Sequence, residues 1–328
     1  MKALLFDEPK GPEALYLGTV PDPVVGPDDV LIANVATSVN RGDLLQLKGQ
    51  YPVEKPSAVS LGMDAAGTVI EVGENVTDFA IGDNVCALVR EGAFAQLVAA
   101  PAAMCLRLPG NLSFTKAAAI PEVFITAYLA LHQLANLQSG EHVLIHAGAS
   151  GVGTAAIQLA HHYGATVCVT ASAGKHEHLK AIGADCCIDY RTQDFDEVVL
   201  KRTNGKGANV LLDFIGAPYA AQNVKCIAMD GRIVALGMLG GRFTEGFDSS
   251  PFIMKRLTLF GSTLRNRPQP FKEALLADFN REIWPLFASR ELHPIVDSIF
   301  DWDDAVSGLK YMEANANVGK IVITIGAD

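Results

Sequence analysis

The stretch from His142 to Ala160, HVLIHAGASGVGTAAIQLA, has the residue types and the spacing of a site that binds phosphate groups. Its pattern predicts a buried strand over His142–His146, a tight turn over Ala147–Gly151 and a helix over Val152–Tyr163. A turn of this kind brings backbone N–H groups and a helix N-terminus up to a pyrophosphate. The stretch therefore predicts dinucleotide binding, with a plain strand–turn–helix unit as the alternative.

Glycines give this turn its pattern. They stand at Gly148, Gly151 and Gly153, and Ser150 lies where the fingerprint G-x-G-x-x-G has its second glycine. A glycine fingerprint alone is a weak signal, but the apolar run before it and the helical pattern after it strengthen the prediction.

The segment after the next strand bears on the choice between NAD and NADP. The predicted strand Thr166–Thr170 is followed by Ala-Ser-Ala-Gly-Lys, which contains no carboxylate to repel a 2′-phosphate. NAD-binding folds usually have an acidic residue there. Ser172 can donate a hydrogen bond and Lys175 brings a positive charge, so NADPH is the expected cofactor. The alternative for Lys175 is an ordinary solvated lysine at a helix start.

The elements that must position these residues alternate between strand and helix from Glu141 onward. This alternation predicts right-handed crossovers and a parallel sheet. The further strands are expected at Cys186–Tyr190, Val210–Phe214, Arg232–Leu236 and Thr258–Ser262, and the further helices at Lys175–Ile182, Asp194–Thr203 and Ala217–Met229. Gly216 and Gly237 follow the fourth and fifth strands, where bare backbone can lie against a nicotinamide, although each could be a plain turn glycine.

The first hundred residues have a different texture. Short strand patterns alternate with turns rich in Pro, Gly, Asn and Asp, which is typical of a compact β barrel or sandwich. After Arg265 the pattern predicts a helix over Phe271–Ala288, a strand near Val296–Phe300, a helix over Trp302–Glu313 and a last strand over Lys320–Ile325.

Composition excludes several classes of protein. The 328 residues are 49% hydrophobic, and the net charge of −10 gives no electrostatic footprint for nucleic acid or acidic membranes. We expect no apolar run as long as a membrane span, no signal peptide and a cytoplasmic location. None of the six cysteines forms a C-x-x-C pair, so they are interpreted as reduced and structural.

Motifs along the whole chain resemble the zinc-independent, zeta-crystallin-like quinone oxidoreductase branch of the medium-chain dehydrogenase/reductase superfamily. They are HAGASGVGTAAIQLA, Pro121-Glu122 with Thr126-Ala127-Tyr128, Val39-Asn40-Arg41-Gly42-Asp43, Gly49-Gln50-Tyr51 and Asn317-Val318-Gly319-Lys320-Ile321-Val322. The resemblance implies an α/β Rossmann domain over residues 121–262 and a GroES-like, mostly β catalytic domain over 1–120 plus 263–328. It also implies a homodimer joined at the sheet edge formed by Thr258–Ser262, with a covered edge in a monomer as the alternative.

The resemblance also assigns roles to residues. Tyr190 is expected near the 2′-phosphate, and Asn40 and Tyr51 are expected to line the acceptor cleft. The catalytic candidates are Tyr51, Asn40 and Ser150. The full set expected to bind NADPH is Thr126, Gly148, Ser150, Gly151, Val152, Gly153, Ser172, Lys175, Tyr190, Gly216, Gly237, Arg265 and Lys320. Asn40 could instead hold a turn, and Tyr51 could be a packed loop ring.

No metal is expected. Zinc-dependent relatives carry a catalytic Cys and a Gly-His-Glu run in the first domain. By resemblance, the corresponding positions of this chain are Asn40 and Gly62-Met63-Asp64. A zinc site needs three or four converging N, S or O ligands, and the sequence offers no such set. His146, at a strand end, is a weak candidate ligand.

These features predict reduction of an electrophilic acceptor rather than oxidation of an alcohol, because no Lewis acid would lower the alcohol pKa. A quinone accepts hydride and gains charge on oxygen, which Asn40, Tyr51 or Arg265 could stabilise. The first hypothesis is an NADPH-dependent quinone oxidoreductase. The alternatives are an NADPH-dependent alkenal or enoyl reductase, and an NADPH-binding structural or RNA-binding protein. The natural acceptor stays open.

Overall fold

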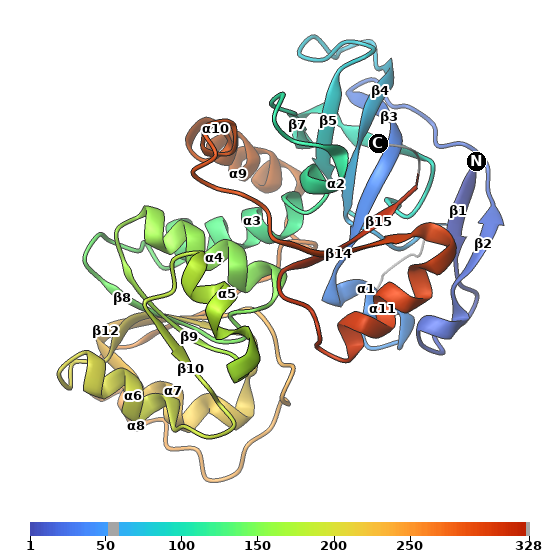
Figure 1. Ribbon diagram of the computed structural model, residues 1–328. Coiled ribbons are helices and arrows are strands. Elements are labelled where there is room, and N and C mark those ends of the chain that lie inside the picture. The colour runs from blue at the N-terminus through green and yellow to red at the C-terminus, as the bar shows by residue number, and fades with distance from the viewer. Residues whose placement is uncertain (52–58, 326–328) are drawn as a thin grey trace. The chain divides into compact units, whose positions relative to one another are not determined.

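The computed structural model describes residues 1–51 and 59–325, and the chain divides into two compact units (Figure 1). The first unit comprises Met1–Ile125 and Pro268–Asp328, and the second comprises Thr126–Arg267. The sequence predicted the corresponding boundaries after residues 120 and 262.

The second unit is built on a six-stranded parallel sheet in the order β10-β9-β8-β11-β12-β13. Renumbered within this unit, the order is 3-2-1-4-5-6, which is that of a Rossmann dinucleotide-binding fold and confirms the predicted fold class. The strands are β8 (His142–Ile145), β9 (Thr166–Thr170), β10 (Cys186–Ile188), β11 (Ala208–Asp213), β12 (Ile227–Ala235) and β13 (Thr258–Gly261).

Helices alternate with these strands, as βαβ units require. They are α4 (Gly151–His162), η4 (Ala173–Lys175), α5 (His176–Ala181), α6 (Phe195–Arg202), η5 (Ala217–Tyr219), α7 (Ala220–Cys226) and α8 (Ser250–Met254). The prediction of one helix over Ala217–Met229 is wrong at its end. The helix stops at Cys226, because Ile227 already pairs with Ala208 and begins β12.

The first unit is mostly β, as predicted for a GroES-like domain. Its main sheet follows the order β14-β15-β3-β4-β5-β7, with β6 also paired to β3, and a separate hairpin joins β1 and β2. Its strands are β1 (Lys2–Leu5), β2 (Tyr16–Thr19), β3 (Asp29–Val39), β4 (Asp64–Val72), β5 (Asn84–Leu88), β6 (Leu97–Pro101), β7 (Cys105–Arg107), β14 (Val296–Asp301) and β15 (Lys320–Thr324). The long β3 is central, because it pairs with β4, β6 and β15.

The helices of the first unit lie at its strand ends and in its C-terminal part. They are η1 (Pro12–Ala14), α1 (Arg41–Leu47), η2 (Ala102–Met104), α2 (Phe114–Ala117), α9 (Gln269–Glu282), α10 (Trp284–Ala288), η6 (Trp302–Asp304) and α11 (Ala305–Glu313). The predicted single helix over Phe271–Ala288 is in fact divided at Ile283. Pro285 lies in the first turn of α10 and has no N–H for the ladder of a continuous helix.

A helical segment joins the two units. It contains α3 (Pro121–Tyr128) and a π-helical turn, η3 (Leu129–Leu134). Phe114–Leu134 is long and apolar enough to cross a membrane by length and composition, which corrects the expectation that no run reaches that length. Its most apolar window is 83% buried inside the structure, and the core helix of a globular domain passes the same test.

Candidate functional site

The glycine-rich turn lies between β8 and α4. Ala147 adopts a left-handed conformation with φ 48°, and the Gly148 N–H donates to the Thr170 carbonyl at 3.0 Å, which fastens the turn to the end of β9. Ser150 is the N-cap of α4, and its Oγ accepts from the Gly153 N–H at 3.0 Å. The N–H groups of Gly151 and Val152, at the first two helical positions, have no acceptor inside the helix.

Close contacts with neighbouring residues explain two of the glycines. A Cβ on Gly148 would lie 2.7 Å from Cβ of Val169, and one on Gly153 would lie 2.6 Å from the carbonyl oxygens of Ala147 and Gly148. Neither position can take a side chain without a backbone shift. The turn therefore presses against its own helix and against β9, and leaves the helix N-terminus open. This geometry fits a bound pyrophosphate.

The segments after β9 and β10 lie side by side. Thr170 pairs with Ile188 in the parallel ladder, and the Ala171 N–H donates to the Ile188 carbonyl at 3.0 Å. Ser172 therefore follows one strand end and Tyr190 follows its neighbour. The end of β9 also adjoins the glycine turn, since Thr170 accepts from Gly148, so the structure brings the phosphate turn and the predicted 2′-phosphate segment to the carboxyl end of the sheet.

Two cationic side chains belong to this edge. Lys175, at the end of η4, is half-buried, and the guanidinium of Arg191 lies 5.8 Å from the ring centroid of Tyr190. Sequence reasoning missed Arg191, although a cation directly after the third strand is a readable signal. Because Tyr190 is 45% exposed, its ring and the neighbouring guanidinium are accessible to a ligand.

The loops after β11 and β12 hold the other predicted glycines. Gly216 has φ 84°, and a Cβ there would lie 2.8 Å from the Gly241 carbonyl. A Cβ on Gly237 would lie 3.1 Å from the Phe214 carbonyl. These glycines allow close packing between loops at the carboxyl end of the sheet.

The remaining two candidates of the second unit lie at its chain ends. Thr126 is 9% exposed within α3, and Arg265 is half-buried in the segment after β13. Their roles toward a cofactor stay predictions.

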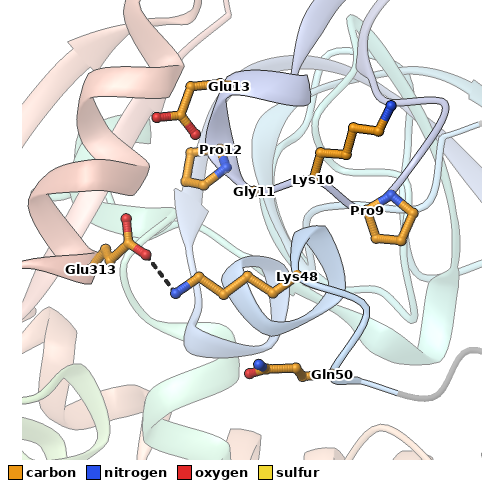
Figure 2. Close-up of a pocket in the computed structure, with 8 residues that line it drawn as sticks. All are labelled: Pro9, Lys10, Gly11, Pro12, Glu13, Lys48, Gln50 and Glu313. Carbon is orange, nitrogen blue, oxygen red and sulfur yellow. Dashed lines mark ion pairs between the residues drawn. The ribbon is translucent and has the colours of Figure 1, made fainter.

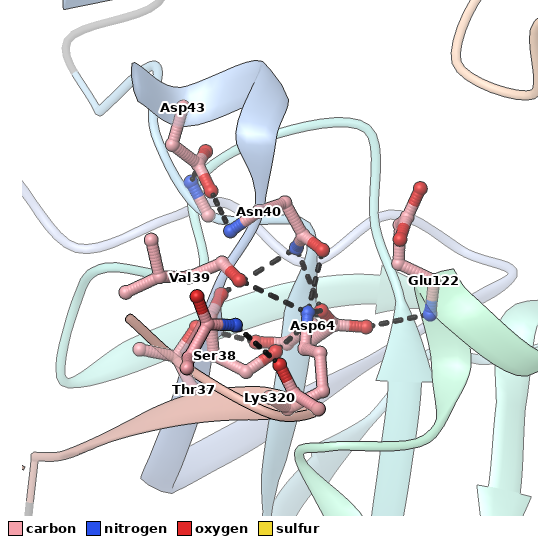
Figure 3. A network of polar contacts seen from close by, with 11 residues as sticks. Thr37, Ser38, Val39, Asn40, Asp43, Asp64, Glu122 and Lys320 are labelled. Atoms are coloured by element: carbon pink, nitrogen blue, oxygen red, sulfur yellow. Dashed lines mark hydrogen bonds and ion pairs between the residues drawn. The ribbon is translucent and has the colours of Figure 1, made fainter. Parts of the chain in front are cut away.

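A buried polar cluster lies in the first unit, around the carboxylate of Asp64 at the start of β4 (Figure 3). Its Oδ2 accepts from Ser38 Oγ at 2.6 Å and from Asn40 Nδ2 at 2.8 Å. Its Oδ1 accepts from the backbone N–H of Glu122 at 2.7 Å. One carboxylate therefore ties β3, β4 and the first turn of α3 together.

Lys320, from the start of β15, is the cation of this cluster. Its ammonium lies 2.5 Å from Asn40 Oδ1, 3.1 Å from the Val39 carbonyl and 3.3 Å from Asp64 Oδ2, and the residue is 3% exposed. All three of its hydrogens have protein acceptors. Its ammonium is therefore already used within the fold, and the contact to the cofactor predicted for Lys320 stays a prediction.

Asn40 is occupied in the same way. It is 5% exposed, its Oδ1 accepts from Lys320, and its Nδ2 donates to Asp64. Its amide therefore orients the cluster, and the direct hydrogen bond from Asn40 to an acceptor stays a prediction.

Asp43 continues the cluster into α1. Its carboxylate accepts from the Asn40 N–H at 2.8 Å and from the Gly62 N–H at 2.9 Å. Burial raises the pKa of Asp43 to about 6 despite these two hydrogen bonds.

The cluster does not fit a metal ion. Residues 1–51 and 59–325 contain no group of three or more His, Cys, Asp or Glu side chains arranged to hold one. Asn40 and Asp64 are turned toward the Lys320 ammonium, which would oppose a second cation at the same point.

Tyr51 is the last described residue before 52–58. Its half-buried ring lies close to the start of α1, since a Cβ on Gly42 would be 3.9 Å from Tyr51 Cε2 and 3.6 Å from Met63 Cε. Tyr51 therefore adjoins the first turn of α1, in the same unit as the buried cluster.

A separate polar pocket of about 530 Å³ lies nearby in the first unit (Figure 2). An ion pair between Lys48 and Glu313, at 2.5 Å, crosses it. Among the described residues, those that line it include none of the predicted site residues: Pro9, Lys10, Gly11, Pro12, Glu13, Lys48, Gln50 and Glu313. We assign it no role.

Two protein-family models match the chain. A model described as a zinc-binding dehydrogenase matches residues 151–280, and one described as an alcohol dehydrogenase GroES-like domain matches residues 26–110.

Curated relatives match almost the full chain. The chain is 34% identical over 321 residues to a putative inactive phenolphthiocerol synthesis polyketide synthase of Mycobacterium tuberculosis, covering 94% of this chain but 19% of the relative. The chain thus spans about a fifth or less of the first curated relatives it matches. It is 31% identical over 323 residues to the human synaptic vesicle membrane protein VAT-1 homolog, covering 93% of this chain and 81% of the relative.

Solved structures match over almost the full length of the chain. Mycobacterial Rv1454c complexed with NADPH superposes with a TM-score of 0.89 at 27% identity, over 99% of this chain and 100% of that one. An NAD-dependent alcohol dehydrogenase gives 0.88 at 30% identity, over 99% and 100%. The Pseudomonas syringae pv. Tomato DC3000 quinone oxidoreductase gives 0.87 at 28% identity, over 98% and 99%.

The Lys320 pair predicts a large stability effect. We expect Lys320→Met to lower the free energy of unfolding by about 3–5 kcal/mol, because it leaves the Asp64 carboxylate buried without its cation. The matched control is Lys310→Met, which removes an exposed ion pair with Glu13 at 3.0 Å and should leave the free energy of unfolding almost unchanged. Urea denaturation of both variants measures the difference. Equal, small losses would show that the cluster contributes little.

Proposed function

This chain belongs to the medium-chain dehydrogenase/reductase superfamily, and on that premise we propose that it is an oxidoreductase that transfers hydride from NADPH to a quinone without zinc. The observation that carries the proposal is the turn between β8 and α4. There the close approach of Gly153 to the carbonyls of Ala147 and Gly148 leaves a helix N-terminus open for a pyrophosphate.

The segment after β9 supports NADPH over NADH. Residues Ala171–Lys175 contain no carboxylate, Ser172 offers a hydroxyl, and Lys175 and Arg191 bring positive charge. The neighbours do not decide the question, because one is complexed with NADPH and another is named as NAD-dependent. The residues of this chain therefore carry the choice.

Bound NADPH would supply the hydride. On the protein side, the open N–H groups of Gly151 and Val152 and the hydroxyl of Ser150 would hold the pyrophosphate. In the first unit, the Tyr51 hydroxyl would donate a hydrogen bond to the acceptor oxygen that gains charge. The Asp64–Lys320 cluster would hold the start of α1, which adjoins Tyr51, in place.

The cation of this cluster supports a mechanism without zinc. Lys320 already neutralises Asp64, and a quinone, unlike an alcohol, needs no Lewis acid to activate it for hydride transfer.

An NADPH-dependent alkenal or enoyl reductase is the alternative, since the glycine turn serves either acceptor. Steady-state oxidation of NADPH with a panel of quinones and a panel of alkenals separates the two. We expect turnover with quinones. Turnover confined to alkenals would replace the proposal, and no oxidation of NADPH or NADH with either panel would end it.

Lys175→Ala tests the choice of cofactor. We expect it to weaken NADPH binding by about 1.5–3 kcal/mol, because a charge-assisted contact to the 2′-phosphate is lost, and to leave NADH binding nearly unchanged. Dissociation constants from fluorescence titration measure this. Lys180→Ala, at an exposed site on α5, is the control. Equal losses for both cofactors would contradict the assignment.

Tyr51→Phe tests the acceptor side. We expect the quinone kcat to fall by about tenfold or more, as one donor to a developing oxyanion is lost, while the NADPH dissociation constant stays the same. Tyr16→Phe, which removes an exposed hydroxyl bonded to Asp7, is the matched control. Unchanged turnover would return Tyr51 to a packing role.

We also propose a homodimer through β13, the edge strand next to β12, where Leu259 is 55% exposed. An uncovered apolar edge favours pairing with a second copy. Light scattering should give twice the monomer mass for the wild type and the monomer mass for Leu259→Lys. A monomeric wild type would contradict the proposal.

A further inference from the structure

We infer that a buried chain of hydrogen bonds through His146 fixes the relative positions of the loops that would hold the two halves of the dinucleotide, and that His146 is a positioning residue for the cofactor. The inference rests on the proposed function, since it concerns how that cofactor platform is held.

The hydrogen-bond chain runs across the ends of three neighbouring strands, β9, β8 and β11. Thr170 stands at the end of β9, and His146 directly follows β8. The Oγ1 atom of Thr170 lies 3.1 Å from Nδ1 of His146. His146 Nε2 lies 2.8 Å from Asn223 Oδ1 on α7, and Asn223 Nδ2 donates to Asp213 Oδ2 at 3.1 Å, at the end of β11. The ladder of the sheet stops where these strands end, so side chains provide the lateral connection beyond it.

The donor and acceptor groups fix the direction of each hydrogen bond in this series. The Asp213 carboxylate can only accept, so it turns the amide nitrogen of Asn223 toward itself and the amide oxygen toward His146. The imidazole must then carry its hydrogen on Nε2. Its Nδ1 is left as the acceptor for the Thr170 hydroxyl. Each group has one role that agrees with its neighbours.

The side chains of this hydrogen-bond chain are shielded from solvent. His146 is 0% exposed, Thr170 1% and Asn223 2%. The rings of Phe195 and Tyr219 pack edge-on against the imidazole at centroid distances of 4.7 and 4.9 Å. Burial lowers the pKa of His146, which keeps the neutral form that the chain requires. Hydrogen bonds in such surroundings are costly to leave unmade.

Each end of this hydrogen-bond chain, Thr170 at one end and Asp213 at the other, holds a loop that would contact the cofactor. At one end, the Thr170 carbonyl accepts from Gly148 in the phosphate turn, and Ser172 follows two residues later. At the other end, Asp213 Oδ1 accepts from the Gly216 N–H at 3.0 Å, and the Asp213 carbonyl accepts from the Gly237 N–H at 3.2 Å. The hydrogen-bond chain therefore connects the loops predicted to bind the adenosine half of the cofactor to those predicted to bind its nicotinamide half.

A matched pair of substitutions cuts the chain on one side at a time. His146→Asn retains an acceptor near the Nδ1 position for Thr170 and loses the donor to Asn223. His146→Gln retains a donor near the Nε2 position for Asn223 and loses the acceptor for Thr170. Thr170→Val and Asn223→Leu cut the same two links without changing His146. They serve as second variants where a His146 variant does not fold.

The probes are NADPH and 2′-phospho-ADP-ribose, which lacks the nicotinamide, and the readout is the dissociation constant of each. We expect His146→Asn and Asn223→Leu to weaken NADPH by about tenfold and the fragment by less than about twofold, since only the Gly216 and Gly237 loops are released. His146→Gln and Thr170→Val should weaken both ligands by the same factor. His161→Gln, at an exposed site in the last turn of α4, should change neither.

The outcomes separate the inference from the function on which it rests. A wild type that binds neither probe would overturn both. A wild type that binds NADPH, with His146→Asn and Asn223→Leu changing both ligands equally or not at all while the melting temperature falls, would reduce His146 to a structural residue and leave the proposed function standing.

Discussion

The burial of one charged pair organises the first unit. A carboxylate without exposure to water is stable only when its oxygens are fully bonded and its charge is balanced. Asp64 meets this requirement with Ser38, Asn40, the Glu122 N–H and Lys320. Because these partners come from β3, α3 and β15, satisfying one charge fixes the meeting point of distant parts of the chain. The start of α1, which adjoins Tyr51, is positioned by the same cluster.

The second unit meets a related constraint with a different solution. The carboxyl ends of its strands carry polar groups that the sheet ladder no longer pairs, and they are sealed beneath aromatic rings. His146 and Asn223 are neutral, and Asp213 is the charged end of their chain. Neutral groups cost less to bury than charges. The first unit thus uses a buried charge to fix its strands, and the second uses an ordered chain of dipoles to align its loops.

Local patterns made much of this fold predictable. The alternation of strand and helix patterns and the glycine fingerprint predicted the elements and the parallel sheet of the second unit, because both signals lie within short stretches of sequence. The roles of Asn40 and Lys320 were not predictable in this way, because Lys320 and Asp64 are 256 residues apart and only strand pairing brings them together. The end of α7 at Cys226 and the break at Ile283 depended, respectively, on pairing with Ala208 and on one proline. Arg191 was missed although its signal was local.

The serine in the fingerprint fits the backbone of the turn without strain. The residue at position 150 has φ −70° and ψ 166°, an extended conformation that any residue can adopt, so glycine is not needed for backbone freedom. The glycines that cannot be replaced are those whose Cβ would meet backbone or a neighbouring strand, Gly153 and Gly148. Ser150 uses its side chain to accept from the Gly153 N–H, which fixes the start of α4, and its own hydroxyl hydrogen is left to donate. Compared with glycine at this position, serine thus adds a helix cap and a hydroxyl donor beside the phosphate turn.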